Sequence, residues 1–93
     1  MSDDLSHRRK RLTFRAWHRG TRETDLMIGG FADAHVGAFD ADQLDRFEAL
    51  IEVPDLVLFD WVTGRAAPDP AHDHDVLGLM QRFAAASLIG KAE

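Results

Sequence analysis

The sequence contains no cysteine and no tyrosine among its 93 residues. Without cysteine, the chain can form no disulfide framework, no thiolate zinc site and no cysteine nucleophile. No apolar run approaches the roughly 20 residues that a membrane-spanning helix needs. The N-terminus also has no apolar core of a signal or transit peptide, since Leu5 is its one large aliphatic residue before Leu12. These absences predict a protein of the bacterial cytoplasm without membrane insertion, although a mature mitochondrial protein would look similar.

Reactive groups that could support catalysis are also scarce. The serines are Ser2, Ser6 and Ser87, and none of them lies in a Gly-x-Ser-x-Gly turn. The pair Gly29-Gly30 lacks the flanking residues of a phosphate-binding loop. A chain this short is too small to bury a flavin or a nicotinamide and still form a hydrophobic core. We therefore expect no enzyme activity from the chain alone and no tightly bound cofactor.

A histidine–aspartate cluster, His72-Asp73-His74-Asp75, contains residue types that bind zinc. The spacing i, i+2 does not place the two histidines on one face of a helix, and acidic residues are favourable at a helix start in any case. The cluster therefore predicts the beginning of a helix, and we expect no metal.

The charge is divided unevenly along the chain. Residues 1–22 contain seven bases and two acids, a net +5, whereas the other 71 residues contain four bases and fourteen acids, a net −10. Such a division indicates an interaction surface. Nucleic acid is an improbable partner, because the acidic body would repel it and the bases do not alternate with stacking aromatic residues. A surface that binds an acidic partner protein and a solvated basic face both remain open.

Apolar residues recur at helical spacing and nowhere form a lasting strand alternation. The sequence therefore predicts an all-α fold, a small bundle of about five short helices in a single domain over residues 1–93. The third helix has the clearest start, because Asp40 and Gln43 form a capping box. The first helix is predicted at Leu5–Trp17, with Ser6 as N-cap and Gly20 as stop, and the second at Thr24–Val36. The fourth has Pro54 in its first turn and Gly64 after it, and the fifth is predicted at Asp73–Leu88. Residues 65–71 are predicted to form a loop, and residues 1–5 and 89–93 to fray.

The predicted core lies on the apolar faces of these helices. Phe59 and Trp61 of the fourth helix are assigned to the core. The stripes expected to face inward are Leu44, Phe47, Leu50 and Ile51, then Leu56, Phe59 and Val62, and then Val76, Leu77, Met80, Phe83 and Ala84.

The stretch Arg19-Gly20-Thr21-Arg22-Glu23 places two guanidinium groups and a carboxylate around a glycine, between two predicted helices. It is either a simple helix linker or an exposed knob. In a knob, glycine would let another backbone approach closely, and the charged groups would form directed hydrogen bonds to a partner. The residues alone leave both interpretations open.

With Asp25 added, this stretch resembles the RGxxE signature of the small assembly factors that promote covalent flavinylation of succinate dehydrogenase, the bacterial SdhE proteins and their mitochondrial relatives. The resemblance covers roughly residues 8–64 and continues loosely through Pro68 into the last predicted helix. It includes an arginine-rich helix before the motif, and Phe47-x-x-Leu50-Ile51-Glu52 and Phe59-x-Trp61 after it. His18 and Thr21 depart from the arginine and methionine of many relatives, which puts binding strength in question more than identity.

The resemblance implies a monomeric five-helix module that binds the flavoprotein subunit of succinate dehydrogenase, and relatives also act on fumarate reductase. FAD would become attached to a histidine of that partner, so the chain itself would supply no nucleophile. The rival interpretations are a small acidic regulatory protein, such as an antitoxin, and a helical DNA-binding domain. The residues expected to bind the partner are Arg19, Gly20, Glu23, Arg8, Arg9, Arg15 and Asp25.

Overall fold

The computed structural model describes the backbone of residues 2–92 and the side chains of residues 5–86. Within that part of the chain there is no strand, and the predicted all-α fold of five helices is confirmed. No helix there is both long and apolar enough to cross a membrane. The elements are α1 (Ser2–Trp17), α2 (Arg22–His35), the 3-10 turn η1 (Val36–Ala38), α3 (Ala41–Ile51), α4 (Asp55–Val62), the 3-10 turn η2 (Pro70–His72) and α5 (Asp75–Ala92).

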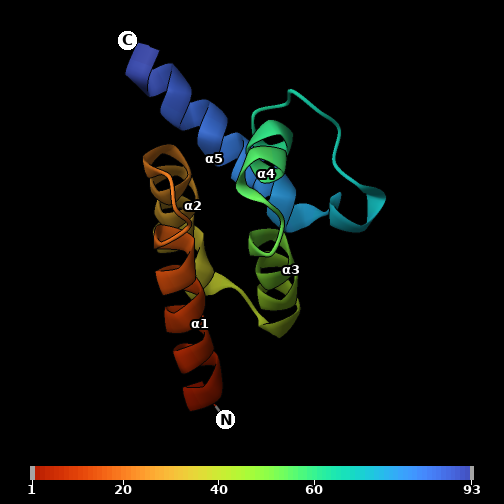
Figure 1. Cartoon of the computed structure of the whole chain (residues 1–93). Coiled ribbons are helices and arrows are strands. Elements are labelled where there is room, and N and C mark those ends of the chain that lie inside the picture. Colours follow the sequence, from red (N-terminus) through yellow and green to blue (C-terminus); the bar gives the residue numbers. More distant parts are fainter. Residues whose placement is uncertain (1, 93) are drawn as a thin grey trace.

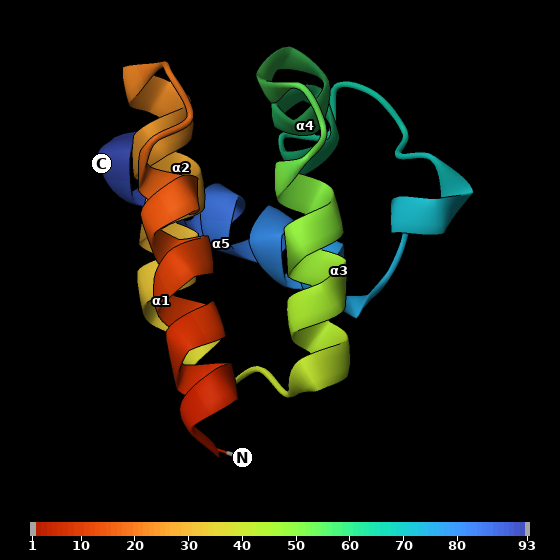
Figure 2. The same cartoon turned by 60° about the horizontal axis from the view of Figure 1, so that its bottom comes forward.

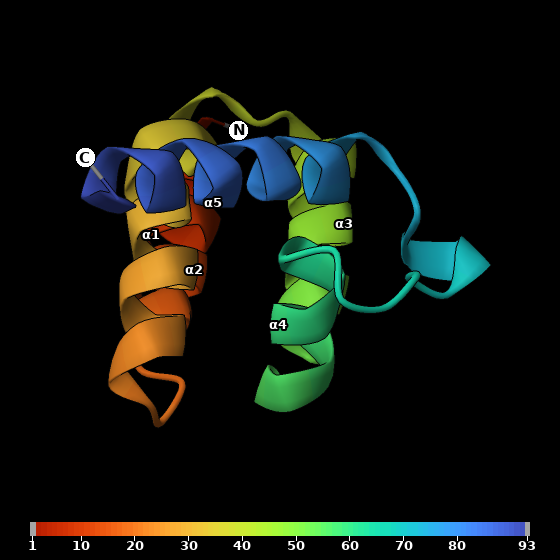
Figure 3. The same ribbon diagram turned by 90° about the horizontal axis from the view of Figure 1, so that it is seen from above.

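The helices form two columns that are bridged by a fifth helix. The first column is the antiparallel pair α1 and α2, and the second consists of α3 followed by α4 (Figure 1). Helix α5 crosses both columns on one side (Figures 2 and 3). The α1–α2 turn, residues 18–21, and the α3–α4 junction, residues 52–54, lie at the same end of the two columns. We call this the turn end.

Local capping fixes several helix boundaries. The predicted capping box is confirmed: the Asp40 carboxylate accepts from the Gln43 backbone N–H at 2.9 Å, and the Gln43 side chain accepts from the Asp40 N–H at 3.1 Å. After α4, Gly64 takes a φ of +80°, and the Arg65 N–H donates to the Asp60 carbonyl at 2.8 Å. This arrangement satisfies the last carbonyls of α4 and ends it where the sequence predicted.

Some predicted boundaries were wrong. Helix α1 begins at Ser2, so Ser6 lies inside the helix and is not its N-cap. Pro54 is the N-cap of α4 and not part of its first turn. Helix α2 begins two residues earlier than predicted, and α5 begins two residues later and runs to Ala92.

The sequence also made predictions for the two chain ends and for the α4–α5 connection. Fraying at 1–5 and 89–93 stays a prediction, and residues 1 and 93 lie outside the described residues. The α4–α5 connection, predicted as a loop at 65–71, contains η2, which the sequence analysis did not predict.

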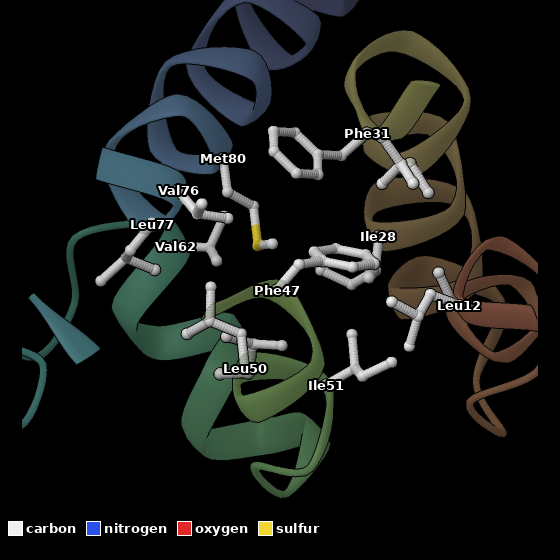
Figure 4. Close-up of a cluster of buried hydrophobic side chains, with 14 of the residues drawn as sticks. Leu12, Ile28, Phe31, Phe47, Leu50, Ile51, Val62, Val76, Leu77 and Met80 are labelled. Carbon is white, nitrogen blue, oxygen red and sulfur yellow. The ribbon is translucent and has the colours of Figure 1, made fainter. Parts of the chain in front are cut away.

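The core lies between the two columns and beneath α5, and all five helices contribute to it (Figure 4). Phe31 is at its centre, with the rings of Phe47 and Phe83 each 5.9 Å away between centroids. The inward stripes predicted for α3 and α5 are buried, with Phe83 partly so.

Helix α4 is rotated from the predicted orientation. Its buried residues are Leu58, Trp61 and Val62, so Trp61 is in the core as predicted. Leu56 is 81% exposed and Phe59 is half-buried outside the core cluster, so their assignment to the inner face was wrong. Because α4 is apolar on more than one side, periodicity could not choose its inner face.

The close packing of α1 on α2 depends on Gly29. The indole ring of Trp17 lies against this position, and a Cβ atom on residue 29 would overlap the ring. The Trp17 Nε1–H donates to the Asp33 carboxylate at 3.3 Å, which fixes the ring across α2. A glycine in the helix costs about 1 kcal/mol relative to alanine, but here it allows the contact that sets the geometry of the α1–α2 turn.

Candidate functional site

The α1–α2 turn is a compact knob held by a carboxylate from the helix that follows it. One oxygen of Asp25 accepts hydrogen bonds from the backbone N–H of Arg19 at 2.6 Å and of Gly20 at 3.3 Å. Gly20 is exposed and has a φ of +122°, which side chains rarely tolerate. A Cβ atom there would meet nothing within 4 Å. Glycine is therefore required by the backbone, while the space around it is open to another molecule.

Two threonines secure the start of α2 below the knob. The Thr21 hydroxyl caps the helix by accepting from the Thr24 N–H at 3.3 Å, and the two hydroxyl groups contact each other. Thr24 is buried, and its hydroxyl also donates to the Asp55 carboxylate at 3.4 Å. Thr21, the departure from the methionine of many relatives, thus acts as a cap that a methionine side chain cannot provide.

Arg19 points away from solvent, toward the α3–α4 junction. Its Nε donates to Asp55 Oδ1 at 2.6 Å, and its two terminal nitrogens donate to the carbonyls of Ile51 and Val53 at 2.6 and 2.7 Å. The side chain is only 7% exposed. These carbonyls lie at the C-terminal end of α3, where the helix leaves acceptors unpaired and favours a cation. Arg19 therefore joins the two junctions of the turn end.

Asp55 is the site residue that the sequence reasoning missed. Its place directly after Pro54 suits a helix N-terminus, where a carboxylate is favourable, and does not point to Arg19. In the structure it accepts from both Arg19 and Thr24, which come from the other column. A pattern of local spacing cannot indicate the contact between Arg19 and Asp55, because these residues are 36 positions apart in the sequence.

The basic residues of α1 contact acidic residues of the same chain. Arg8 donates to Asp45 at 2.6 Å and to Glu48 at 2.9 Å, and these two hydrogen bonds raise the pKa of Arg8 above its ordinary value. Arg15 pairs with Glu48 and with Glu52. The three acids recur at i, i+3 and i+7 and so lie along one face of α3. The uneven charge of the sequence thus acts in part within the fold.

Arg9 also contacts its own chain, because its guanidinium donates to the Phe39 carbonyl at 2.7 Å. By contrast, Arg22 and Glu23 are exposed in the first turn of α2, and neither takes part in an ion pair among the described side chains. The structure therefore brings Arg19, Gly20, Glu23 and Asp25 together at the knob. It places Arg8 and Arg9 along α1, away from the knob. Arg15 lies nearer, in the groove that Arg19 also lines, and pairs there with Glu52.

Shallow grooves flank the knob on both sides. One lies between α1 and the α3–α4 junction and is lined by Phe14, His18, Val53 and Asp55 among others. Its α1 wall is rigid, because the rings of Phe14 and His18 stack with centroids 4.0 Å apart. The other groove lies beside Gly20 and reaches Leu26. Open grooves of this kind suit contacts with a protein surface better than capture of a small molecule.

The histidine cluster acts in the structure as a helix start. The His74 Nδ1 accepts from the Leu77 N–H at 3.3 Å, and this contact caps α5. Burial lowers the pKa of His74, which keeps the ring neutral and able to accept. Within the described residues no three side chains of histidine, cysteine, aspartate or glutamate are placed to hold a metal ion.

Comparison with known proteins connects this geometry to one family. Residues 10–84 match the model of the family described as "Flavinator of succinate dehydrogenase". The chain is 51% identical over 63 residues to the FAD assembly factor SdhE of Acetobacter pasteurianus, which is 68% of this chain and 58% of that protein. It is 29% identical over 87 residues to the mitochondrial succinate dehydrogenase assembly factor 2 of Candida glabrata, 89% of this chain and 57% of that protein.

A third relative is the corresponding mitochondrial factor of Dictyostelium discoideum, with 30% identity over 78 residues, 84% of this chain and 55% of that protein. The matches thus span a little over half the length of these relatives. The family match includes the knob, the α3–α4 junction and the first part of α5, into which the resemblance was expected to continue. The chain therefore belongs to the family of flavinators of succinate dehydrogenase.

Proposed function

We propose that this chain is an assembly factor that binds the flavoprotein subunit of succinate dehydrogenase and promotes covalent attachment of FAD to that subunit. Family membership supports the proposal, and so do the names of the relatives. The observation in the structure that carries it is the exposed Gly20 knob, held from within by Arg19 and Asp25. A rigid, open turn with free charged groups beside it suits insertion into another protein.

We assign the residues of the site to two roles. Gly20 and Glu23 contact the partner, because one is exposed with open space around it and the other is exposed and unpaired among the described side chains. Arg19 and Asp25 are positioning residues, since their polar groups are used to shape the turn. Arg8, Arg9 and Arg15 hold α1 against the rest of the chain, and so set the direction in which the knob points.

The chemistry, in this proposal, belongs to the partner. Covalent attachment requires the partner's histidine and the flavin to be held at about 3–3.5 Å in the correct orientation. A binding protein accelerates that step if it binds the competent conformation of the flavoprotein more tightly than other conformations. The chain needs no nucleophile and no tight FAD site of its own, and it acts as a monomer in the bacterial cytoplasm. Fumarate reductase would be a second target if its flavoprotein presents the same surface.

Co-expression of the flavoprotein subunit with variants of this chain tests the proposal. Gly20→Arg and Glu23→Ala should reduce covalent flavin, measured as in-gel flavin fluorescence, because they block or remove partner contacts. Matched controls are Gly64→Arg, at an exposed glycine with open space and a φ of +80°, and Asp42→Ala, at an exposed acid in the first turn of α3. Undiminished covalent flavin with both knob variants would contradict the assignment of the knob.

A further inference from the structure

The exposed large hydrophobic side chains of the described residues gather at one end of the molecule. They are Phe14, Leu26, Leu56 and Val57. Phe14 lies in the last turn of α1, Leu26 near the start of α2, and the other two in the first turn of α4. In Figure 3 these three helix ends lie at the turn end of the molecule. Scattered single hydrophobic residues need no explanation, but a group on one end that also carries the family motif does.

The outward orientation of Leu56 is fixed by the polar contacts next to it. Its neighbour Asp55 is held by Arg19 and by Thr24, both from the other column. These contacts set the rotation of α4, so that Leu58 and Trp61 face the core. Leu56 is left 81% exposed. The Arg19–Asp55 contact therefore holds the knob and an apolar residue at a fixed separation.

The size of this apolar group points to part of a larger interface. These four side chains expose on the order of a few hundred Å², which is the size of a functional patch on a monomer. A stable dimer buries about 800 Å² on each partner, so this group is too small to form one alone. It becomes sufficient if it adjoins further contact surface, and the knob provides that surface at the same end.

We propose that Leu56, Val57, Phe14 and Leu26, which we call the apolar ridge, form a second contact site for the same flavoprotein subunit and pack against apolar side chains on its surface. This inference rests on the proposed function. The knob contributes charged and backbone groups that fix the orientation of the two proteins. The apolar ridge contributes affinity, because its side chains are removed from water when the complex forms. The Arg19–Asp55 contact pre-organises both parts, which reduces the entropy lost on binding.

The test is the affinity of purified flavoprotein subunit for the double variant Leu56→Gln, Val57→Thr, measured by isothermal titration calorimetry. Glutamine has nearly the helix propensity of leucine, and threonine is β-branched like valine with a similar helix propensity, so α4 should be retained. Both residues are exposed, and circular dichroism and thermal melting check the fold. The matched control is Ala34→Gln, at an exposed position in the last turn of α2, away from the turn end. We expect the double variant to raise Kd at least tenfold and the control to change it less than twofold.

The outcomes separate this inference from the proposed function. If the wild type binds and the double variant binds equally well, the apolar ridge is overturned and the proposed function stands. If the wild type binds but does not raise covalent flavin, the proposed function is overturned, and a weakened double variant still supports the ridge. No binding by the wild type overturns both. A wild-type dimer in sedimentation that the double variant abolishes, with unchanged partner affinity, would assign the ridge to self-association and contradict the inference.

Discussion

The guanidinium group of Arg19 lies 2.6 Å from the carboxylate of Asp55, across 36 residues of sequence. This contact joins the α1–α2 turn to the α3–α4 junction, and with them the two columns of the fold. The family motif therefore has a structural part as well as an exposed part. The Arg19 side chain is hydrogen-bonded within the molecule, whereas Gly20 and Glu23 are exposed to solvent.

Replacing Arg19 should destabilise the fold. Arg19→Ala removes a nearly buried ion pair and leaves Asp55 and two carbonyl groups without their donor, so we expect a loss of about 2–4 kcal/mol in the free energy of unfolding. Chemical denaturation measures it. Arg19→Lys should restore a minor part, because an ammonium group does not reach three acceptors in a planar fork. Arg65→Ala, at an exposed pair with a 4.0 Å separation, is the control and should change stability by less than about 0.5 kcal/mol. Equal effects of the two alanine variants would contradict this role of Arg19.

Two glycines inside helices should respond to alanine with opposite signs. Gly29→Ala introduces a methyl group into the Trp17 ring, and we expect a loss of about 1–3 kcal/mol from overpacking. At Gly78 of α5, the nearest atom to an added Cβ is a terminal nitrogen of Arg82 at 3.7 Å, which is ordinary contact. Gly78→Ala should therefore stabilise the protein by about 0.5–1 kcal/mol through helix propensity. Thermal melts of the two variants decide the matter, and a stabilised Gly29→Ala would refute the packing role of that glycine.

Stability should fall as the pH drops below about 6.5, in part because of His74. Burial lowers the pKa of His74 from its ordinary value of 6.5, with further lowering by His72 and Arg46 and an opposing effect of Asp75. The unfolded chain therefore binds this proton more readily, so the contribution of neutral His74 is complete above pH 6.5 and is lost as the pH falls through the lowered pKa. The protonated ring also can no longer accept from Leu77.

Urea unfolding of the wild type and of His74→Asn between pH 5 and pH 8 tests this explanation. Asparagine retains a capping acceptor but does not titrate, so the slope of stability against pH should become smaller. His7→Asn, at an exposed residue of α1, is the control and should leave the slope unchanged. If His74→Asn keeps the wild-type slope, another group causes the pH dependence.

Local features of this fold could be predicted, and long-range contacts could not. The capping box of Asp40 and Gln43 and the helix stop at Gly64 involve neighbouring residues, and the sequence predicted both. The rotation of α4 depends on Asp55 meeting Arg19, a contact that no helical period encodes. For the same reason the sequence did not indicate that Arg8 and Arg15 pair with acids of α3 and its C-cap. The contact of these bases with a partner protein stays a prediction.

The stretch around Gly20 lies between two helices as the sequence predicted, because glycine next to charged residues is a local pattern. Its role in binding a partner stays a prediction. Its division into inward and outward groups was not predictable, since exposure depends on how the two columns pack. Leu56 shows this most clearly. It was expected on the inner face of α4, and it is the most exposed large hydrophobic residue among the described side chains.

The rate of covalent flavin attachment tests the central claim most directly. Purified flavoprotein subunit without covalent flavin would be mixed with FAD, with and without this chain, and in-gel flavin fluorescence followed over time. The account predicts a faster rise with the wild-type chain, a strongly reduced effect with Gly20→Arg, and an undiminished effect with Gly64→Arg, at the other exposed glycine of positive φ. An identical time course with and without the wild-type chain would contradict it.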